Sequence, residues 1–298
     1  MDETHCKYVG SFALLKSATH HSPIPISDFN GFNPAWYSNL TSGSILHVCS
    51  QALPDFVKFM PEINVPFKLL TNNSDMTIPD DFNESDKILN NPLLIKWYAQ
   101  NCIGTHEKLV KIPIGLDYHS MRPSGKKRVW EQPEKHLWGI KKYATEQELE
   151  LMSFNKTPFW NRQVNAYANF RLAMNTRWGE KRYVQDRKDA LNVPNVYHEP
   201  TWVYRNVCWE HMSQYAFVIS PQGNGLDCHR TWEALCLGCI PIVKTSGLNS
   251  LFDDLPVWIV NEWSEVTQEN MVKKIEEFKK PFNYEKLTLA YWRNILAQ

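Results

Sequence analysis

Residues 217–243 carry the strongest structural signal in the chain, and they read Phe217-Val-Ile-Ser-Pro-Gln-Gly-Asn-Gly-Leu-Asp-Cys-His-Arg-Thr-Trp-Glu-Ala-Leu-Cys-Leu-Gly-Cys-Ile-Pro-Ile-Val243. An apolar run at 215–220 is followed by two glycines, by helical spacing at 227–237 and by a second apolar run at 239–243. Short apolar runs bounded by turn residues are typical of buried strands. This order predicts a strand, a glycine loop, a helix and a second strand of a parallel α/β sheet.

The glycine loop and the helix after it are suited to binding an anion. Gly223 and Gly225 let the main chain approach a ligand closely, and a helix N-terminus presents free N–H groups and a partial positive charge. His229 and Arg230 fall in the first helical turn, where a guanidinium can donate to phosphate oxygens. Glu233 shares a helix face with Arg230 and can accept both hydroxyls of a ribose. The alternative is a tight turn followed by a surface ion pair between Arg230 and Glu233.

The same alternation of apolar runs and helical spacing continues along the rest of the chain. In the first part, strands are predicted at 45–49, 67–71 and 109–114, and helices at 51–60 and 93–101. In the second part, strands are predicted at 164–172, 196–198, 215–220, 239–243 and 257–260, and helices at 145–154, 177–191, 204–212, 227–237, 269–279 and 284–296. Residues 122–135 are rich in Pro, Gly and Lys and are predicted to be a linker. The fold class is therefore α/β, with two units that each contain a parallel sheet.

The stretch 220–243 resembles the signature of exostosin-type glycosyltransferases, which are glycosyltransferase family 47 and its viral and algal relatives. In that signature, Ser-Pro-x-Gly precedes an Arg, a Glu-Ala and Gly-Cys-Ile-Pro. The similarity continues through 252–260 and 261–266, and a weaker form covers 69–74, 97–101 and 112–119. The resemblance implies a GT-B fold, in which two Rossmann-like domains face each other across a cleft. It also implies inversion at the anomeric carbon without an obligatory metal.

This resemblance gives each part of the chain an expected role. Residues 1–124 would be an acceptor-binding domain, 125–280 a domain that binds a nucleotide-sugar donor, and 281–298 a helix that packs back on the first domain. The expected donor-binding residues are Ser220, Gly223, Asn224, Gly225, His229, Arg230 and Glu233, with Arg171 and Arg177 as helpers. Arg171 and Arg177 could equally be surface charges.

An inverting transfer needs a general base that takes the proton of the acceptor hydroxyl. In a GT-B enzyme this base is expected in the N-terminal domain, at the carboxyl end of a strand. Asp75 follows the predicted strand at 67–71, whereas Asp117 and His119 follow the one at 109–114. Asp75 is our first choice, with Asp117 or His119 next, although each of them could instead cap a turn or lie on the surface.

Composition limits the classes of function. The 298 residues include 32 Lys plus Arg and 32 Asp plus Glu, so the net charge is zero. A neutral chain without a long apolar run is not built to hold nucleic acid by bulk charge or to span a membrane. The N-terminal residues lack the features of a secretory signal, and seven scattered cysteines suit a reducing compartment. We therefore expect a cytoplasmic protein, in the host cytoplasm if the chain is viral.

No metal and no cofactor are expected. The sequence has no Asp-x-Asp triplet of the kind that holds a divalent cation between phosphates in GT-A enzymes. Cys236 and Cys239 form a CxxC, but one lies on a predicted helix and the other starts a strand, so we expect buried free thiols. Trp36, Trp97 and Trp202 are candidates for stacking on a sugar or a base, although most tryptophans must lie in the core.

The expected reaction is transfer of a sugar from a nucleotide-sugar donor to a hydroxyl of an oligosaccharide or other glycan. The resemblance favours a UDP-sugar, and of xylose, galactose, glucuronate and N-acetylglucosamine we choose UDP-xylose. One alternative is a catalytically inactive GT-B module that binds a nucleotide sugar or a glycan. Another is a different nucleotide-dependent Rossmann enzyme, but the chain lacks a Gly-x-Gly-x-x-Gly motif at the start of its first helix.

Overall fold

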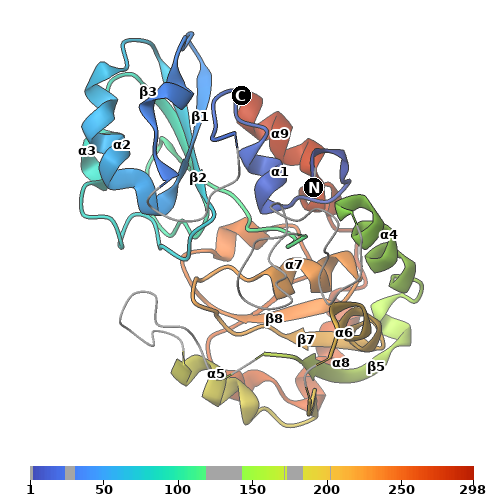
Figure 1. Cartoon of the computed structure of the whole chain (residues 1–298). Coiled ribbons are helices and arrows are strands. Elements are labelled where there is room, and N and C mark those ends of the chain that lie inside the picture. The colour runs from blue at the N-terminus through green and yellow to red at the C-terminus, as the bar shows by residue number, and fades with distance from the viewer. Residues whose placement is uncertain (1–2, 24–30, 119–142, 171, 173–183, 202) are drawn as a thin grey trace.

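The computed structural model describes residues 3–23, 31–118, 143–170, 172, 184–201 and 203–298. These residues form two parallel β-sheets, each with helices packed against it (Figure 1). The α/β class with two parallel sheets, predicted from the sequence, is confirmed.

The first sheet has four strands in the order β1-β2-β3-β4, and all of its pairings are parallel. Its strands are β1 (Ser44–Cys49), β2 (Phe67–Asn72), β3 (Leu94–Ala99) and β4 (Leu109–Lys111). Every residue of β1 and β2 is buried, as expected for parallel strands that are covered on both faces. Figure 1 shows α2 (Leu53–Phe59) and α3 (Ser85–Leu89) on one side of this sheet, with α1 (Ser11–Leu15) and α9 (Leu289–Ala297) on the other.

The second sheet has five parallel strands in the order β6-β5-β7-β8-β9. Its strands are β5 (Gln163–Ala168), β6 (Val196–His198), β7 (Tyr215–Ile219), β8 (Ile240–Lys244) and β9 (Trp258–Val260). Its helices are α4 (Ala144–Phe154), α5 (Val184–Leu191), α6 (Arg205–Met212), α7 (His229–Cys236) and α8 (Gln268–Glu277). The predicted order of strand, glycine loop, helix and strand at 217–243 is present as β7, a loop, α7 and β8.

The helix predicted at 93–101 is wrong, because this segment forms strand β3. It lies between β2 and β4, and the indole nitrogen of Trp97 donates to the hydroxyl of Thr71 on β2 at 2.8 Å. A short apolar run with aromatic residues fits a buried strand as well as a helix, and here the pairing with both neighbours decides. Trp97 has no exposed surface, so it does not serve as the stacking platform that we considered.

Several predicted boundaries move for local reasons. β4 ends at Lys111, earlier than predicted, because Pro113 lacks the N–H that a continuing strand would need. The predicted helix at 284–296 is a 3-10 turn at Tyr284–Leu287 followed by α9. Thr288 separates the two, since its extended main chain lets its hydroxyl cap the N–H of Tyr291. Of the predicted helix at 177–191, only 184–191 lies within the described residues.

The two units share apolar packing. One cluster of buried side chains includes Leu70 and Tyr98 of the first sheet together with Tyr167 and Val218 of the second. Two further clusters belong to the first and the second sheet separately. A shared core fixes how the two units sit relative to each other, which matters for any site between them.

The C-terminal helix lies against the first sheet. The ammonium of Lys68 on β2 donates to the carbonyls of Leu296 and Ala297 at 2.9 and 3.0 Å, and Tyr98 on β3 donates to the carbonyl of Ile295 at 3.0 Å. These bonds satisfy carbonyl groups that have no partner within the last turn of a helix. The predicted domain boundary at residue 124 falls within 119–142, outside the described residues.

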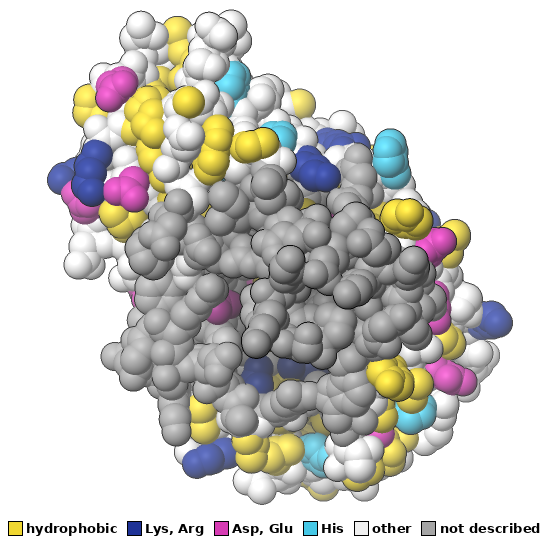
Figure 2. Space-filling model, viewed as in Figure 1, with side chains coloured by type: hydrophobic (Ala, Val, Ile, Leu, Met, Phe, Trp, Pro, Cys, Tyr) yellow, Lys and Arg dark blue, Asp and Glu magenta, His cyan; other side chains and the backbone are white. Residues whose placement is uncertain are grey.

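On the face shown in Figure 2, cationic and anionic side chains are interspersed, and hydrophobic side chains gather over the first unit. All seven cysteines are free, and six of them are buried. In the part of the chain that the structure describes, no helix has both the length and the hydropathy needed to cross a membrane.

Candidate functional site

The turns that follow β3 and β4 in the first unit contact the glycine loop that follows β7 in the second. The main-chain N–H of Ile114 donates to Oδ2 of Asp227 at 2.7 Å, and the N–H of Asp227 donates to Oδ1 of Asn101 at 2.8 Å. His229 Nδ1 lies 2.7 Å from the carbonyl oxygen of Gly115, so this ring nitrogen donates. The carboxyl ends of the two sheets therefore face each other, which is the arrangement that defines a GT-B fold. In α/β proteins, ligands bind at such strand ends.

The chain is crowded at both glycines of the loop, and most of all at Gly225. A Cβ atom on Gly225 would lie 2.8 Å from Nδ2 of Asn101 and 3.3 Å from Cα of Asp75. A Cβ on Gly223 would lie 3.1 Å from Sγ of Cys228. The structure thus brings Asp75, the first-choice base, directly against the predicted donor loop.

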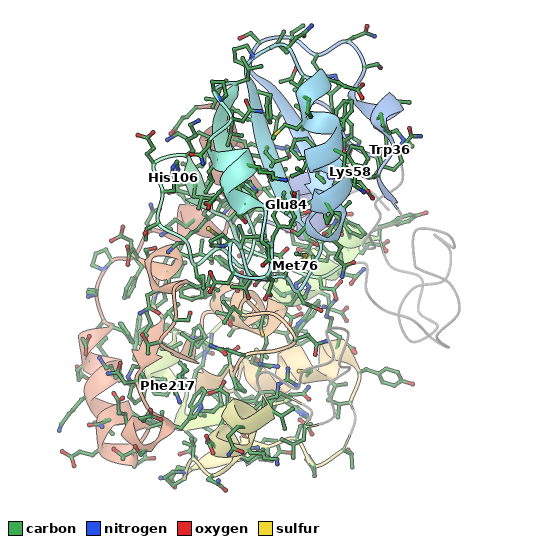
Figure 3. All side chains as sticks on the ribbon, turned by 90° about the vertical axis from the view of Figure 1, so that its left-hand side faces the viewer. Trp36, Lys58, Met76, Glu84, His106 and Phe217 are labelled. Carbon is green, nitrogen blue, oxygen red and sulfur yellow. The ribbon has the colours of Figure 1, made fainter. Side chains whose placement is uncertain are left out.

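The main chain that carries Asp75 is held by the turn after β3. Gln100 accepts a hydrogen bond from the N–H of Asn73 at 3.2 Å and donates to the carbonyl of Ser74 at 3.0 Å. Asn101 donates to the same carbonyl at 3.1 Å. Figure 3 shows Met76, the next residue after Asp75, at the level where the two units meet. The position of Asp75 is therefore set by side chains of the neighbouring strand end.

Two arginines meet beside the glycine loop. Arg230 donates to the hydroxyl of Ser220 and to the carbonyl of Pro221, both at 3.3 Å, and its guanidinium carbon lies 5.4 Å from the centre of the Phe170 ring. Arg187 on α5 donates to the carbonyl of Gln222 at 2.9 Å and lies 5.9 Å from the same ring. Burial lowers the pKa of Arg187, and the nearby charge of Arg230 lowers it further. Two cations that repel each other in this way favour an anion between them.

The sequence predicts a helix at 177–191, which contains Arg187, but it does not single out this residue. Spacing along a helix cannot tell which of several Arg and Lys residues faces a loop that lies 35 residues away in the sequence. Two further residues of the loop were predicted to bind the donor. The hydroxyl of Ser220 forms a hydrogen bond with the hydroxyl of Thr231 at 2.8 Å, and the side chain of Asn224 is exposed.

Four charged side chains surround the thiol of Cys228, at the start of α7. Burial raises the pKa of this thiol, Arg230 and Arg187 lower it, and Asp227 and Asp75 raise it. The basic and acidic groups of the site are thus close enough to influence one atom. The described site combines the two cations with the carboxylates of Asp227 and Asp186 on the same unit and with that of Asp75 on the opposite unit.

Glu233 and Asp117 both lie beside Arg205 of α6. Glu233 Oε1 is 2.9 Å and Asp117 Oδ2 is 3.8 Å from Nη2 of Arg205, and Nη1 of the same arginine donates to the carbonyl of Asp117. Glu233 pairs with Arg205 and not with Arg230, so the alternative of a surface ion pair between Arg230 and Glu233 is wrong. A ribose would have to share this carboxylate with Arg205, and Asp117 would act as a base from within an ion pair.

Asp227 is a site residue that the sequence analysis did not select. Burial raises the pKa of its carboxyl group from 3.8 to about 7, although hydrogen bonds from Ile114, Trp232 and Cys228 act in the opposite direction. The indole nitrogen of Trp232 lies 2.9 and 3.0 Å from its two oxygens. The acidic residue next to the glycine loop was a visible signal, but only the fold shows that it joins the two units.

Other predicted residues fall elsewhere. Arg171, Arg177, His119 and Trp202 lie outside the described residues. Trp36 packs against the apolar cluster of the first sheet. Cys239 accepts a hydrogen bond from Arg162 at 3.1 Å, and Cys236 is buried. Among the described residues, no group of three or more His, Cys, Asp or Glu side chains is placed to hold a metal ion.

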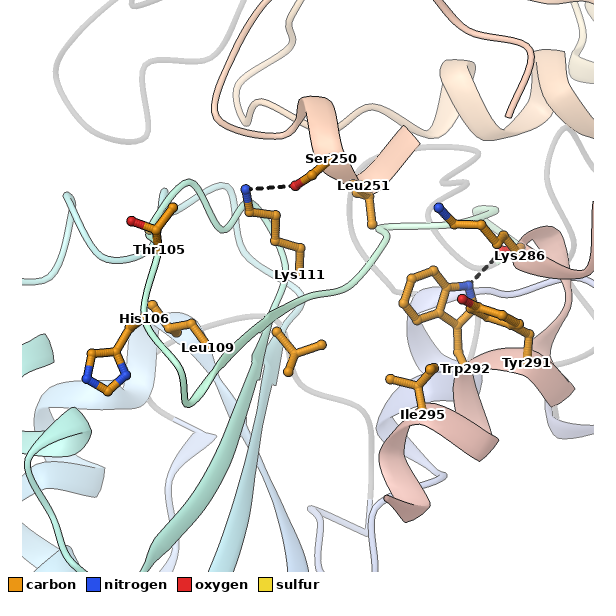
Figure 4. A pocket seen from close by; sticks show the side chains of 12 residues that line it. Thr105, His106, Leu109, Lys111, Ser250, Leu251, Lys286, Tyr291, Trp292 and Ile295 are labelled. Atoms are coloured by element: carbon orange, nitrogen blue, oxygen red, sulfur yellow. Dashed lines mark hydrogen bonds between the residues drawn. The ribbon is translucent and has the colours of Figure 1, made fainter. Parts of the chain in front are cut away.

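A cavity of about 500 Å³ opens on another side of the junction, between β4, the turn at Asn249–Phe252 and α9. Lys111 donates to the hydroxyl of Ser250 at 3.1 Å and to the carbonyl of Gly247, and Lys286 donates to the carbonyl of Asp253. The two ammonium groups lie on different walls of the cavity (Figure 4). They do not converge on one point, so the cavity is a weaker candidate site than the glycine loop.

A scan against protein-family models finds no match, and a search of curated proteins finds none. Among solved structures, the chain is similar to "Trehalose-6-phosphate from E. coli bound with UDP-2-fluoro glucose", with 10% identity over 87% of this chain and 74% of that one and a TM-score of 0.44. It is also similar to a trehalose-6-phosphate synthase described in a study of glycosyltransfer with retention (10% identity, 86% and 73% covered, TM-score 0.40). A third is the N-terminal domain of Candida albicans trehalose-6-phosphate phosphatase (13% identity, 90% and 70% covered, TM-score 0.37). Likenesses of this strength carry no conclusion about donor, acceptor or stereochemistry.

Proposed function

We propose that this protein is a GT-B glycosyltransferase that moves a sugar from a nucleotide-sugar donor to a hydroxyl of a glycan. The observation that carries the proposal is the pairing of Arg187 and Arg230 over the Phe170 ring beside the glycine loop. A diphosphate in this position would accept from both guanidinium groups and from main-chain N–H groups. The resemblance of 220–243 to the exostosin-type signature is further support.

Asp75 is the general base in this proposal. Its carboxylate takes the proton of the acceptor hydroxyl, and the hydroxyl oxygen then forms a bond to the anomeric carbon. The bond from that carbon to the diphosphate breaks, and its electron pair leaves with the diphosphate. Arg187 and Arg230 stabilise the charge that develops on this leaving group. Attack from the face opposite the diphosphate inverts the anomeric carbon.

The finer assignments belong to the same proposal. UDP-xylose is the donor that we expect, and an oligosaccharide is the expected acceptor. The two guanidinium groups take the role that a divalent cation has in other transferases, so the transfer should not need a metal. Arg171, Arg177 and His119 keep their proposed roles as helpers at the donor and as an alternative base. The competing function is an inactive module that binds the donor or a glycan without transfer.

The donor site is tested by nucleotide binding. We expect UDP to raise the melting temperature more than GDP or CMP does, with and without EDTA, because a ligand of the native state stabilises it by mass action. Replacing a charged hydrogen-bond donor should cost about 1.5–3 kcal/mol, or roughly 10- to 100-fold in affinity. Arg230→Ala and Arg187→Gln should each show this loss in calorimetric titration. Lys188→Gln, an exposed neighbour on the same helix, is the matched control.

Transfer is tested with UDP-xylose and an oligosaccharide acceptor, and NMR of the product reads the anomeric configuration. Asp75→Asn should bind UDP as the wild type does and lose about 100-fold or more in kcat, which is typical for loss of a general base. Normal turnover of this variant would transfer the role to Asp117 or His119. Binding of UDP without any transfer would favour the inactive module, and no response to nucleotides would remove the donor site altogether.

A further inference from the structure

Asn101 connects the loop that carries Asp75 to the loop that is proposed to hold the donor. Its side-chain nitrogen donates to the carbonyl of Ser74 at 3.1 Å in the first unit. Its side-chain oxygen accepts from the N–H of Asp227 at 2.8 Å in the second unit. One amide group thus spans the junction of the two units between the base and the glycine loop.

The position is well suited to an asparagine. Asn101 has a φ of +53°, a left-handed conformation that asparagine tolerates better than most residues with a side chain. The residue has no exposed surface, and its main-chain carbonyl accepts from the N–H of Ile78 at 3.1 Å. A Cβ atom at Gly225 would lie only 2.8 Å from the side-chain nitrogen of Asn101. The amide is therefore fixed by the main chain on one side and by the glycine loop on the other.

We propose that Asn101 is a positioning residue that sets the separation between the Asp75 carboxylate and the donor. This inference rests on the proposed function. A primary amide holds an N–H donor group and an acceptor oxygen in one fixed plane, and here the nitrogen meets the carbonyl of Ser74 while the oxygen meets the N–H of Asp227. Shifts of about 1 Å in the reacting groups are enough to slow a reaction roughly 100-fold. Asn101 touches neither reactant in this scheme, so it acts through Asp75 and the loop.

The test separates the two bonds of the amide. Asn101→Asp keeps the acceptor for Asp227 and tolerates the left-handed main chain, but its carboxylate cannot donate to Ser74. At alkaline pH, where this buried carboxyl group is ionised, we expect kcat to fall about 100-fold while the Kd for UDP stays within about twofold. At acidic pH the new carboxyl group is protonated and donates again, so the ratio of variant to wild-type kcat should rise as the pH falls. A residue that served only to hold the fold would instead lower the melting temperature and the fraction of protein that binds UDP, with kcat per folded molecule unchanged.

The control uses another amide. Asn91→Asp makes the same chemical change in the turn before β3, where Asn91 accepts from the N–H of Leu93. This variant should keep most of the wild-type kcat. A loss with Asn91→Asp as large as with Asn101→Asp would overturn the proposal.

A second variant guards against misfolding. Asn101→Gly accepts the left-handed main chain without strain and removes both side-chain bonds. It should melt as a folded protein, bind UDP at full stoichiometry and show the same loss of kcat. Wild-type turnover in either Asn101 variant overturns this inference and leaves the proposed function in place. A wild-type protein without transfer activity overturns both.

Discussion

The main-chain N–H of Ile114 donates to the carboxylate of Asp227 at 2.7 Å, so a buried acid beside the glycine loop is bonded to the end of the other sheet. The same acid lies within hydrogen-bond distance of the indole of Trp232. The junction between the two units therefore contains a titratable group whose charge state affects stability.

Asp227 should make the protein less stable as the pH rises. Burial raises the pKa of its carboxyl group from 3.8 to about 7. The folded state then keeps a proton that the unfolded state releases between these two pH values. The free energy of unfolding should fall by up to about 1.4 kcal/mol per pH unit over this range. Urea denaturation of wild type and Asp227→Asn at several pH values checks this, and the variant should lack this contribution to the slope.

His47 should act in the opposite direction. Burial lowers the pKa of this imidazole from 6.5 to about 4, while its hydrogen bond to Asn72 at 2.8 Å raises it. The unfolded state therefore takes up a proton first, and stability should be lost as the pH falls from 6.5 to 4.

The two groups oppose each other between pH 4 and 6.5, so their single variants are informative together. Asp227→Asn should reveal the loss of stability in acid that His47 causes. His47→Gln should leave a protein whose stability increases as the pH falls. Parallel pH profiles for both variants and the wild type would show that neither group controls the stability.

Arg205→Met should destabilise the protein by about 3 kcal/mol, because it leaves the carboxylates of Asp117 and Glu233 without their shared cation. The loss is measured by urea denaturation, with Lys188→Gln as an exposed control. Adding Glu233→Gln should restore part of the stability. If the double variant is no more stable than Arg205→Met, unpaired charge is not the cause of the loss.

Gly247→Ala should weaken the packing between the two units. Its Cβ would lie 2.4 Å from the Cβ of Ile103, so the main chain or Ile103 has to move. A crowded substitution of this kind costs about 1–3 kcal/mol, which a thermal melt resolves. Ile103→Gly removes the Cβ and Cγ2 atoms that would lie 2.4 and 2.7 Å away, so Gly247→Ala should cost less in that background than in the wild type. An unchanged melting temperature of Gly247→Ala would mean that the junction accommodates the extra methyl group without loss of stability.

The two α/β units and the segment at 217–243 could be predicted from the sequence because the signals are local. Apolar runs between turn residues indicate strands, and the glycines followed by His229 and Arg230 predict an anion-binding loop. β3 was assigned to a helix because a short segment of mostly apolar residues, interrupted by Lys96, fits both structures. Only its pairing with β2 and β4 removes that ambiguity.

By itself, the sequence determined the class of fold and the glycine loop, and it made Arg230 and Asp75 candidate site residues, since all of these depend on residue type and on spacing along the chain. The tertiary structure decided that Arg187 joins Arg230, that Glu233 pairs with Arg205, and that Asn101 and Asp227 connect the two units. Each of these contacts joins residues at least 28 positions apart, on helices and turns whose relative placement follows from the packing of the shared core. No local pattern specifies that placement, because it arises from many weak contacts acting together.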